Sequence, residues 1–250
     1  MNAFIIGWVA LFFSGYALFD AFAVISRMAA SKASMNAFGA AIEKIMNTLK
    51  RLSIFSFPPA LGYFVMRRDL DALFFAIFVA IVFAALSVSA AIFFRHSLAR
   101  YFFMVSKSFG GGSGVLRSFI RPDALLVDDR ERLSDRGENV PGLVASLRQH
   151  LPLLLMATWV YFIFGASIFL INILAIFFVD AAPVILQGLG FFNGLGTLVL
   201  AFLIDPKISR FLDNRESLDE ITLVILTSQF SSIAIVSPIV FGSLYAVSHY

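Results

Sequence analysis

Long apolar stretches separated by short polar segments make up most of this chain. A helix rises about 1.5 Å per residue and the hydrocarbon core of a bilayer is about 30 Å thick, so about 20 apolar residues make one crossing. Five stretches clearly reach this length. They run approximately over residues 3–26, 70–94, 151–179, 182–204 and 221–247. The pattern therefore predicts an all-α, polytopic membrane helix bundle.

Residues 35–64 form a sixth and less regular candidate, with charges in the first half and Pro58-Pro59 in the second. At 100° per residue, the polar side chains share one face of a helix and apolar side chains take the opposite face. The polar face consists of Asn36, Glu43, Asn47 and Lys50. We predict a second span that is amphipathic, is broken at Pro58-Pro59 and lines a cavity with its polar face. The bundle would then have about six transmembrane helices.

An interfacial helix is the alternative for residues 35–51, because a two-faced helix can also lie in the plane of the headgroups. In that arrangement the apolar residues 54–66 are too few to cross the bilayer. These residues would then form a re-entrant segment, or the chain would have only five spans. The two termini would lie on opposite sides of the membrane.

Basic residues are distributed unevenly between the two sides that six spans define. The side that holds both termini has only Arg67 and Arg68 in its loops, whereas the other side carries most of the remaining Lys and Arg residues. Because cytoplasmic loops carry an excess of Lys and Arg, the second side is predicted to be cytoplasmic and both termini to lie outside. Residues 1–250 then form a single membrane domain with a cytoplasmic loop at about 95–150. This loop begins as a basic amphipathic helix.

The composition agrees with a membrane protein and excludes several kinds of chemistry. Hydrophobic residues make up 60% of the 250 residues and charged residues 14%, against about 45–50% and about 25% in soluble domains. The absence of Cys excludes disulfides, thiolate metal sites and cysteine nucleophiles. The net charge of +3 is explained by topology, so we expect membrane lipids as partners and no nucleic acid.

Catalysis has little support in the sequence. His96, His150 and His249 are far apart and lie at the ends of spans, so they show no metal-ligand grouping. The chain has no nucleophile elbow and no His-Glu-x-x-His helix. We therefore predict a protein that is not an enzyme and that uses no cofactor or metal.

Charges within the first two spans are the strongest functional signal. Asp20 lies late in the first span and Arg27 follows seven residues later on the same helical face. A charge at bilayer depth costs at least about 2.5–3.5 kcal/mol, so such groups face a partner or a water-filled cavity. Two interpretations follow: a self-paired network that fixes helix register, or a cationic excess that attracts an anionic headgroup. The candidate substrate-binding residues are Arg27, Lys50, Arg51, Asp20, Glu43 and Asn47.

Four elements of the chain resemble the Amj-type alternate lipid II flippases, which are six-span bacterial proteins. They occur in the order expected for that family. They are the acid and arginine Asp20 and Arg27, the pair Arg51 and Pro58-Pro59, the glycine-rich run Gly110 to Ser113, and Asn193-Gly194-Leu195-Gly196-Thr197 followed by Asp205-Pro206 and Asp213.

The resemblance implies a protein of the bacterial inner membrane that moves the undecaprenyl-pyrophosphate-linked peptidoglycan precursor to the outer leaflet. Its partner would be this anionic prenyl-linked lipid. We expect Arg27, Lys50 and Arg51 to contact the pyrophosphate, with Asp20 and Glu43 tuning the charge. The alternatives are a small ion-coupled transporter in which Asp20 is the coupling acid, and a structural or assembly subunit whose charges pair among themselves.

Overall fold

The computed structural model describes residues 2–112, 114–120, 143–199, 202, 204–214 and 218–249. Within these ranges the chain consists of helices joined by turns, and four helices are long and apolar enough to cross a membrane. They are α1 (Asn2–Lys32), α4 (Leu70–Phe93), α9 (Leu151–Phe177) and the continuous stretch Leu218–Ser248. These helices coincide with four of the six predicted spans and support a membrane helix bundle. The count of six is not confirmed.

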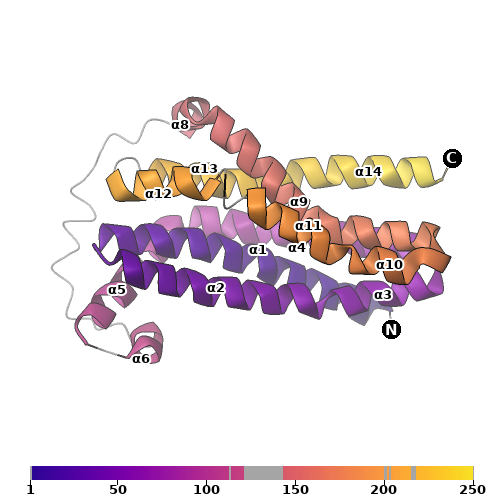
Figure 1. The fold of residues 1–250 in the computed structure, drawn as a ribbon, viewed down its shortest axis with the longest axis horizontal. Coiled ribbons are helices and arrows are strands. Elements are labelled where there is room, and N and C mark those ends of the chain that lie inside the picture. Colours follow the sequence, from indigo (N-terminus) through magenta and orange to yellow (C-terminus); the bar gives the residue numbers. More distant parts are fainter. Residues whose placement is uncertain are drawn as a thin grey trace.

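The second predicted span forms two helices, α2 (Asn36–Ser56) and α3 (Pro58–Arg67). The break lies at Phe57, next to the predicted Pro58-Pro59, because proline lacks an N–H and is tolerated only in the first turn of a helix. α2 runs back along α1 (Figure 1), and the contact is close at Gly39, where an added Cβ would lie 2.6 Å from the Cβ of Ala30. Glycine at this position therefore allows the two backbones to approach.

The fifth predicted span, residues 182–204, is not one continuous helix. After the short 3₁₀ turn Val179–Ala181, the chain forms α10 (Ala182–Gln187) and α11 (Leu189–Val199), each too short to cross a bilayer alone. Gly188 separates them, and its N–H donates to the carbonyl of Ile185 at 2.9 Å. Several glycines lower the helix propensity of this segment, which explains why its apolar length does not give a single helix.

The last crossing contains a local irregularity. It consists of α13 (Leu218–Ser231), a π-helical turn (Ser232–Val236) and α14 (Ser237–Ser248). Pro238 cannot donate a backbone hydrogen bond, and irregular turns in helices are often found next to proline. The carbonyl of Ser232 accepts hydrogen bonds from both the backbone N–H and the hydroxyl of Ser237, the latter at 2.9 Å.

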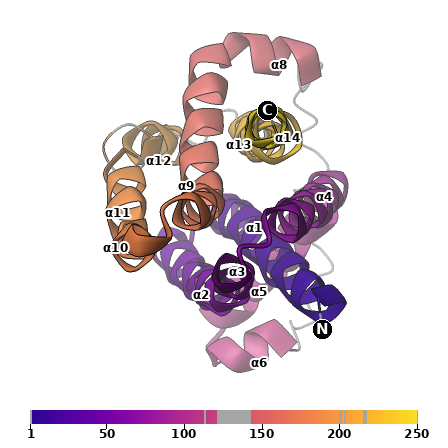
Figure 2. The ribbon, with the colours of Figure 1, turned by 90° about the vertical axis from the view of Figure 1, so that its right-hand side faces the viewer.

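The described parts of the connection between α4 and α9 lie at one end of the bundle, and both chain ends lie at the opposite end, on different sides of it (Figures 1 and 2). Its described parts are α5 (Arg95–Gly110), α6 (Val115–Ile120) and α8 (Leu143–Gln149). α5 is the predicted basic amphipathic helix, with Phe102 and Phe103 buried and Arg100 exposed. The mixed-charge segment 121–142 and Ser113 of the glycine-rich run lie outside the described residues.

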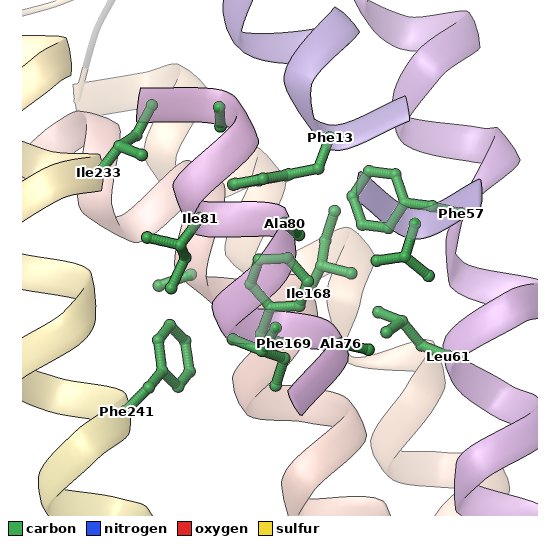
Figure 3. Close-up of a cluster of buried hydrophobic side chains, with 14 of the residues drawn as sticks. Phe13, Phe57, Leu61, Ala76, Ala80, Ile81, Ile168, Phe169, Ile233 and Phe241 are labelled. Carbon is green, nitrogen blue, oxygen red and sulfur yellow. The ribbon is translucent and has the colours of Figure 1, made fainter. Parts of the chain in front are cut away.

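An aromatic cluster, mixed with aliphatic side chains, fills the half of the bundle nearest the chain ends. Figure 3 shows how these side chains pack. The rings of Phe13 and Phe169 meet edge to face with centroids 4.8 Å apart, and Phe241 packs on Phe169 at 5.8 Å. α4 presents small residues such as Ala76 and Ala80 to this cluster. Viewed along the bundle, α1 lies among α2, α4 and α13 (Figure 2), so both faces of its charged stretch meet other helices.

Candidate functional site

A cavity of about 110 Å³ lies in the other half of the bundle, towards the end that carries the α4–α9 connection. Its walls come from α1, α2, α9, α13 and α12 (Asp205–Asn214), with Ile204 just before α12. Apolar side chains such as Ile208, Phe211 and Ile225 form part of the lining. The polar lining consists of Asp20, Arg27, Glu43, Asn47, Lys50, Tyr161 and Thr222.

Lys50 and Asp20 form the inner of two ion pairs in this cavity. The Lys50 Nζ lies 2.5 Å from Asp20 Oδ1, and the two side chains are 15% and 9% exposed. The same ammonium lies 4.9 Å from the ring centroid of Tyr16 and 5.6 Å from that of Phe164. Aromatic faces attract a cation, so α1 and α9 both hold the Lys50 head in place.

Arg27 and Glu43 form the outer and more accessible pair. Arg27 Nε lies 3.5 Å from Glu43 Oε2, and the side chains are 26% and 28% exposed. Arg27 also donates from Nη2 to the Ser209 hydroxyl of α12 at 3.1 Å. Its guanidinium therefore joins α2 to α12 across the cavity.

The spacing of the charges along α1 and α2 explains how the two pairs form. Asp20 and Arg27 are separated by seven residues, as are Glu43 and Lys50, and each helix carries its acid first. Seven residues are two helical turns, about 10 Å, so the members of each set share one face. Because α1 and α2 run in opposite directions, each acid meets the base of the other helix.

The electrostatic balance of the cavity differs from the sequence-based expectation of a cationic excess. Arg27 and Lys50 each have an acidic partner, so the lining carries two positive and two negative groups. Asp20 is 6% exposed, and its second oxygen, Oδ2, has no hydrogen-bond partner among the described residues. The cations are therefore neutralised in this conformation, while one buried carboxylate oxygen keeps an unused acceptor.

The structure brings five of the six candidate residues together. Asp20, Arg27, Glu43, Asn47 and Lys50 line the cavity. Three of the four residues of the predicted polar face are among them, whereas Asn36 is exposed and outside the lining. Arg51 does not join them, because one residue further along a helix is a rotation of about 100°. Its side chain is exposed on the outer face of α2. The binding role predicted for these residues stays a prediction.

Several residues of the site were not identified from the sequence. Tyr16 and Phe164 contact Lys50, and Ser209 binds Arg27. Single aromatic or hydroxyl residues within apolar segments carry no signal of their own. One pattern does carry a signal: apolar residues at positions 204, 208 and 211, with Lys207 and Arg210 at intervening positions, indicate an amphipathic helix with its apolar face turned inward.

One further ion pair and two contacts between a histidine and a carboxylate lie outside the cavity in the described part of the chain. Lys32 Nζ lies 2.6 Å from Asp219 Oδ2, His150 Nε2 lies 3.7 Å from Glu220 Oε2, and His249 Nε2 lies 3.1 Å from Asp71 Oδ1. In the described part of the chain, no group of three or more His, Cys, Asp or Glu residues is placed to hold a metal ion.

Comparisons with protein-family models, curated proteins and solved structures found no match to this chain.

Proposed function

We propose that this protein is a lipid flippase of the bacterial inner membrane that translocates lipid II, the undecaprenyl-pyrophosphate-linked peptidoglycan precursor. The observation that carries the proposal is a cavity inside an apolar helix bundle that holds a guanidinium and an ammonium group. Intramembrane ionisable residues mark substrate or ion pathways by default. The resemblance of Asp20, Arg27 and the C-terminal elements to the Amj-type flippases gives the substrate.

The chemistry of the cavity suits a phosphate-bearing headgroup. Arg27 is partly exposed and its contact with Glu43, at 3.5 Å, is longer than an ordinary hydrogen bond, so incoming phosphate oxygens can compete for it. An apolar cavity of about 150 Å³ accommodates benzene, and a cavity of about 110 Å³ is of a size to accommodate a phosphate group. The larger sugar and peptide parts would remain outside this space, and the prenyl tail would stay in the lipid.

Six crossings and an external location of both termini are part of the proposal. Two observations support a crossing by residues 36–67. α2 and α3 run along the bundle beside α1, and both chain ends lie at the same end of the bundle (Figure 1). The excess of Lys and Arg at the other end then makes that end cytoplasmic. The cavity would face the leaflet in which lipid II is made.

The position of the aromatic cluster supports alternating access. Phe13, Phe57 and Phe169 pack in the half of the bundle that would face outward, beyond the Lys50–Asp20 pair. A headgroup that enters the cavity cannot continue outward unless these rings separate. In the proposed cycle, this arrangement would be the state that is closed to the outside.

Genetic rescue tests this proposal directly. Cells that lack their own lipid II flippases should grow when they express this protein, because translocation of lipid II is then restored. Correct insertion is checked with a reporter fused at the C-terminus. If a correctly inserted protein leaves the cells unable to grow, the flippase assignment is wrong.

A structural role for the charges is the second candidate, because both cations in the cavity already have an acidic partner. Exchanging the charges of the inner pair with Asp20→Lys and Lys50→Asp separates the two candidates. A purely structural pair should be restored in both stability and cellular function. A headgroup site should lose function in a stable protein, since the cation moves to the opposite wall.

A further inference from the structure

The charge balance of the cavity sets a condition on anion binding. Arg27 and Lys50 are matched by Glu43 and Asp20, so the lining is neutral before a ligand enters. A headgroup with two negative charges would give the cavity a net charge of −2 in surroundings of low dielectric, where such a charge is costly. Binding therefore requires either that the ion pairs open towards water or that an acid takes up a proton.

Asp20 is the more deeply buried of the two acids in the lining. Its side chain is 9% exposed, against 28% for Glu43 of the outer pair. One of its oxygens is bound to Lys50, and the other faces no hydrogen-bond donor among the described residues. If Asp20 is protonated, the oxygen that has no partner can carry the proton, and the group is neutral. If Asp20 stays charged after Lys50 has moved away, it is a buried carboxylate without a counter-charge.

The groups around Asp20 also favour its protonation when an anion binds. Lys50 contacts it from α2, and Tyr16 of α1 lies under the Lys50 ammonium. α9 adds Tyr161 to the cavity, while α12 and α13 contribute apolar side chains and Thr222. Arg27 and Glu43 stay paired with each other at the outer position. Within the described lining, Lys50 is the one cation in contact with Asp20, so an anion that draws Lys50 away leaves this carboxylate without a counter-charge.

From this arrangement we propose that anion binding in the cavity is coupled to the uptake of one proton by the Asp20 carboxylate. The proposal rests on the proposed function, since it concerns the same site and the same phosphate-bearing ligand. The proton comes from water and forms the neutral carboxylic acid, and no covalent bond of the ligand changes. Lys50 keeps its own proton and turns its ammonium from Asp20 to the ligand. Release of the ligand returns the proton to water and restores the ion pair.

Linkage makes this coupling measurable, because binding that takes up one proton becomes up to about tenfold tighter for each unit by which the pH falls. The probe is inorganic pyrophosphate, titrated by calorimetry into the purified full-length protein in lipid nanodiscs. Titrations at one pH in buffers of different ionisation enthalpy give the number of protons taken up. Pyrophosphate also titrates, so the quantity of interest is the difference between the wild-type protein and Asp20→Asn.

The expected result is the uptake of about one more proton by the wild-type protein than by Asp20→Asn. Asp20→Asn should bind pyrophosphate with a shallower pH dependence, because its neutral amide imitates the protonated acid. The matched control is Asp219→Asn, which removes the acid of another lysine pair, 2.6 Å from Lys32 and outside the cavity. This control should take up as many protons as the wild-type protein.

Four outcomes would overturn the proposal, and they differ in what they say about the proposed function. Pyrophosphate binding with equal proton uptake in both proteins refutes the coupling and leaves a headgroup site in place. Equal loss of uptake in Asp20→Asn and Asp219→Asn assigns the proton to another group. The absence of pyrophosphate binding at any pH refutes the coupling and the headgroup site together. If Asp20→Asn does not fold, Asp20→Glu replaces it and should keep the wild-type uptake, and a loss of uptake there contradicts the proposal.

Discussion

Lys50 and Asp20 meet across α1 and α2 at 2.5 Å, although 30 residues separate them in the chain. This contact defines the inner end of the cavity, and two turns away Arg27 and Glu43 define the outer end. The two pairs together explain how a strongly two-faced α2 packs in an apolar bundle. They also make the α1–α2 register a property that single substitutions can test.

The inner pair should be strongly coupled in its effect on stability. Lys50→Met leaves the buried Asp20 carboxylate without its partner, and losing one member of a buried pair typically costs about 3–5 kcal/mol. Adding Asp20→Asn removes the stranded charge and should recover much of this loss. A double-mutant cycle from thermal unfolding in detergent measures the coupling, and additive effects of the two substitutions would show that the pair does not stabilise the fold.

Gly39 should be intolerant of any side chain. An added Cβ would lie 2.6 Å from the Cβ of Ala30, so Gly39→Ala must push α1 and α2 apart, at a cost of about 1–3 kcal/mol. Gly62→Ala in α3 is the matched control, because nothing lies within 4 Å of its added Cβ. The unfolding temperature should fall for the first variant and stay the same or rise slightly for the second. Equal melting temperatures would mean that α1 and α2 are not packed this closely.

The topology can be tested by cysteine labelling, because the chain has no Cys of its own. Asn36 and Lys207 are exposed at one end of the bundle, whereas Arg67 and Val247 are exposed at the other. Single cysteines at Asn36 and Lys207 should react with an impermeant maleimide only from the cytoplasmic side. Cysteines at Arg67 and Val247 should react from the outside. If Asn36 and Arg67 react from the same side, residues 36–67 do not cross the membrane.

His96, at the start of α5, gives a prediction for pH. Partial burial is the main cause that lowers the pKa of His96, the neighbouring Arg95 lowers it further, and Asp219 opposes the shift. When the pKa of a histidine is lower in the folded state, the unfolded state binds the proton more tightly. The folded state is therefore favoured most above the ordinary histidine pKa of about 6.5, and its stability falls as the pH drops below that value. The unfolding temperature of the wild-type protein should therefore fall more between about pH 7.5 and pH 5.5 than that of His96→Asn. Parallel curves would contradict this.

The sequence was sufficient to predict the membrane class and much of the polar face of α2. Helical periodicity placed Glu43, Asn47 and Lys50 together, and these three residues line the cavity. The sequence did not predict the pairing of each cation, because charge counts contain no information on the register between helices. Arg51 was grouped with Lys50 as a neighbour in sequence, whereas helical geometry turns it to the exposed face.

Contacts from distant elements were beyond prediction. Ser209 meets Arg27 across 182 positions of the chain, and a single serine on a short helix carries no sign of that contact. The division of residues 182–204 was also missed, because hydropathy measures apolar length and does not register the effect of Gly188 on helix continuity.

The accessibility of lipid II at the outer surface of cells tests the central claim most directly. The measurement uses cells that depend on this protein, with Arg27→Ala and Lys50→Ala as variants and the exposed Lys44→Ala as the matched control. The headgroup site predicts that outer-leaflet lipid II falls sharply in the two cavity variants and is maintained in the control. Arg51→Ala should resemble the control, since Arg51 lies outside the cavity. Undiminished flipping by both cavity variants at normal expression would contradict the account.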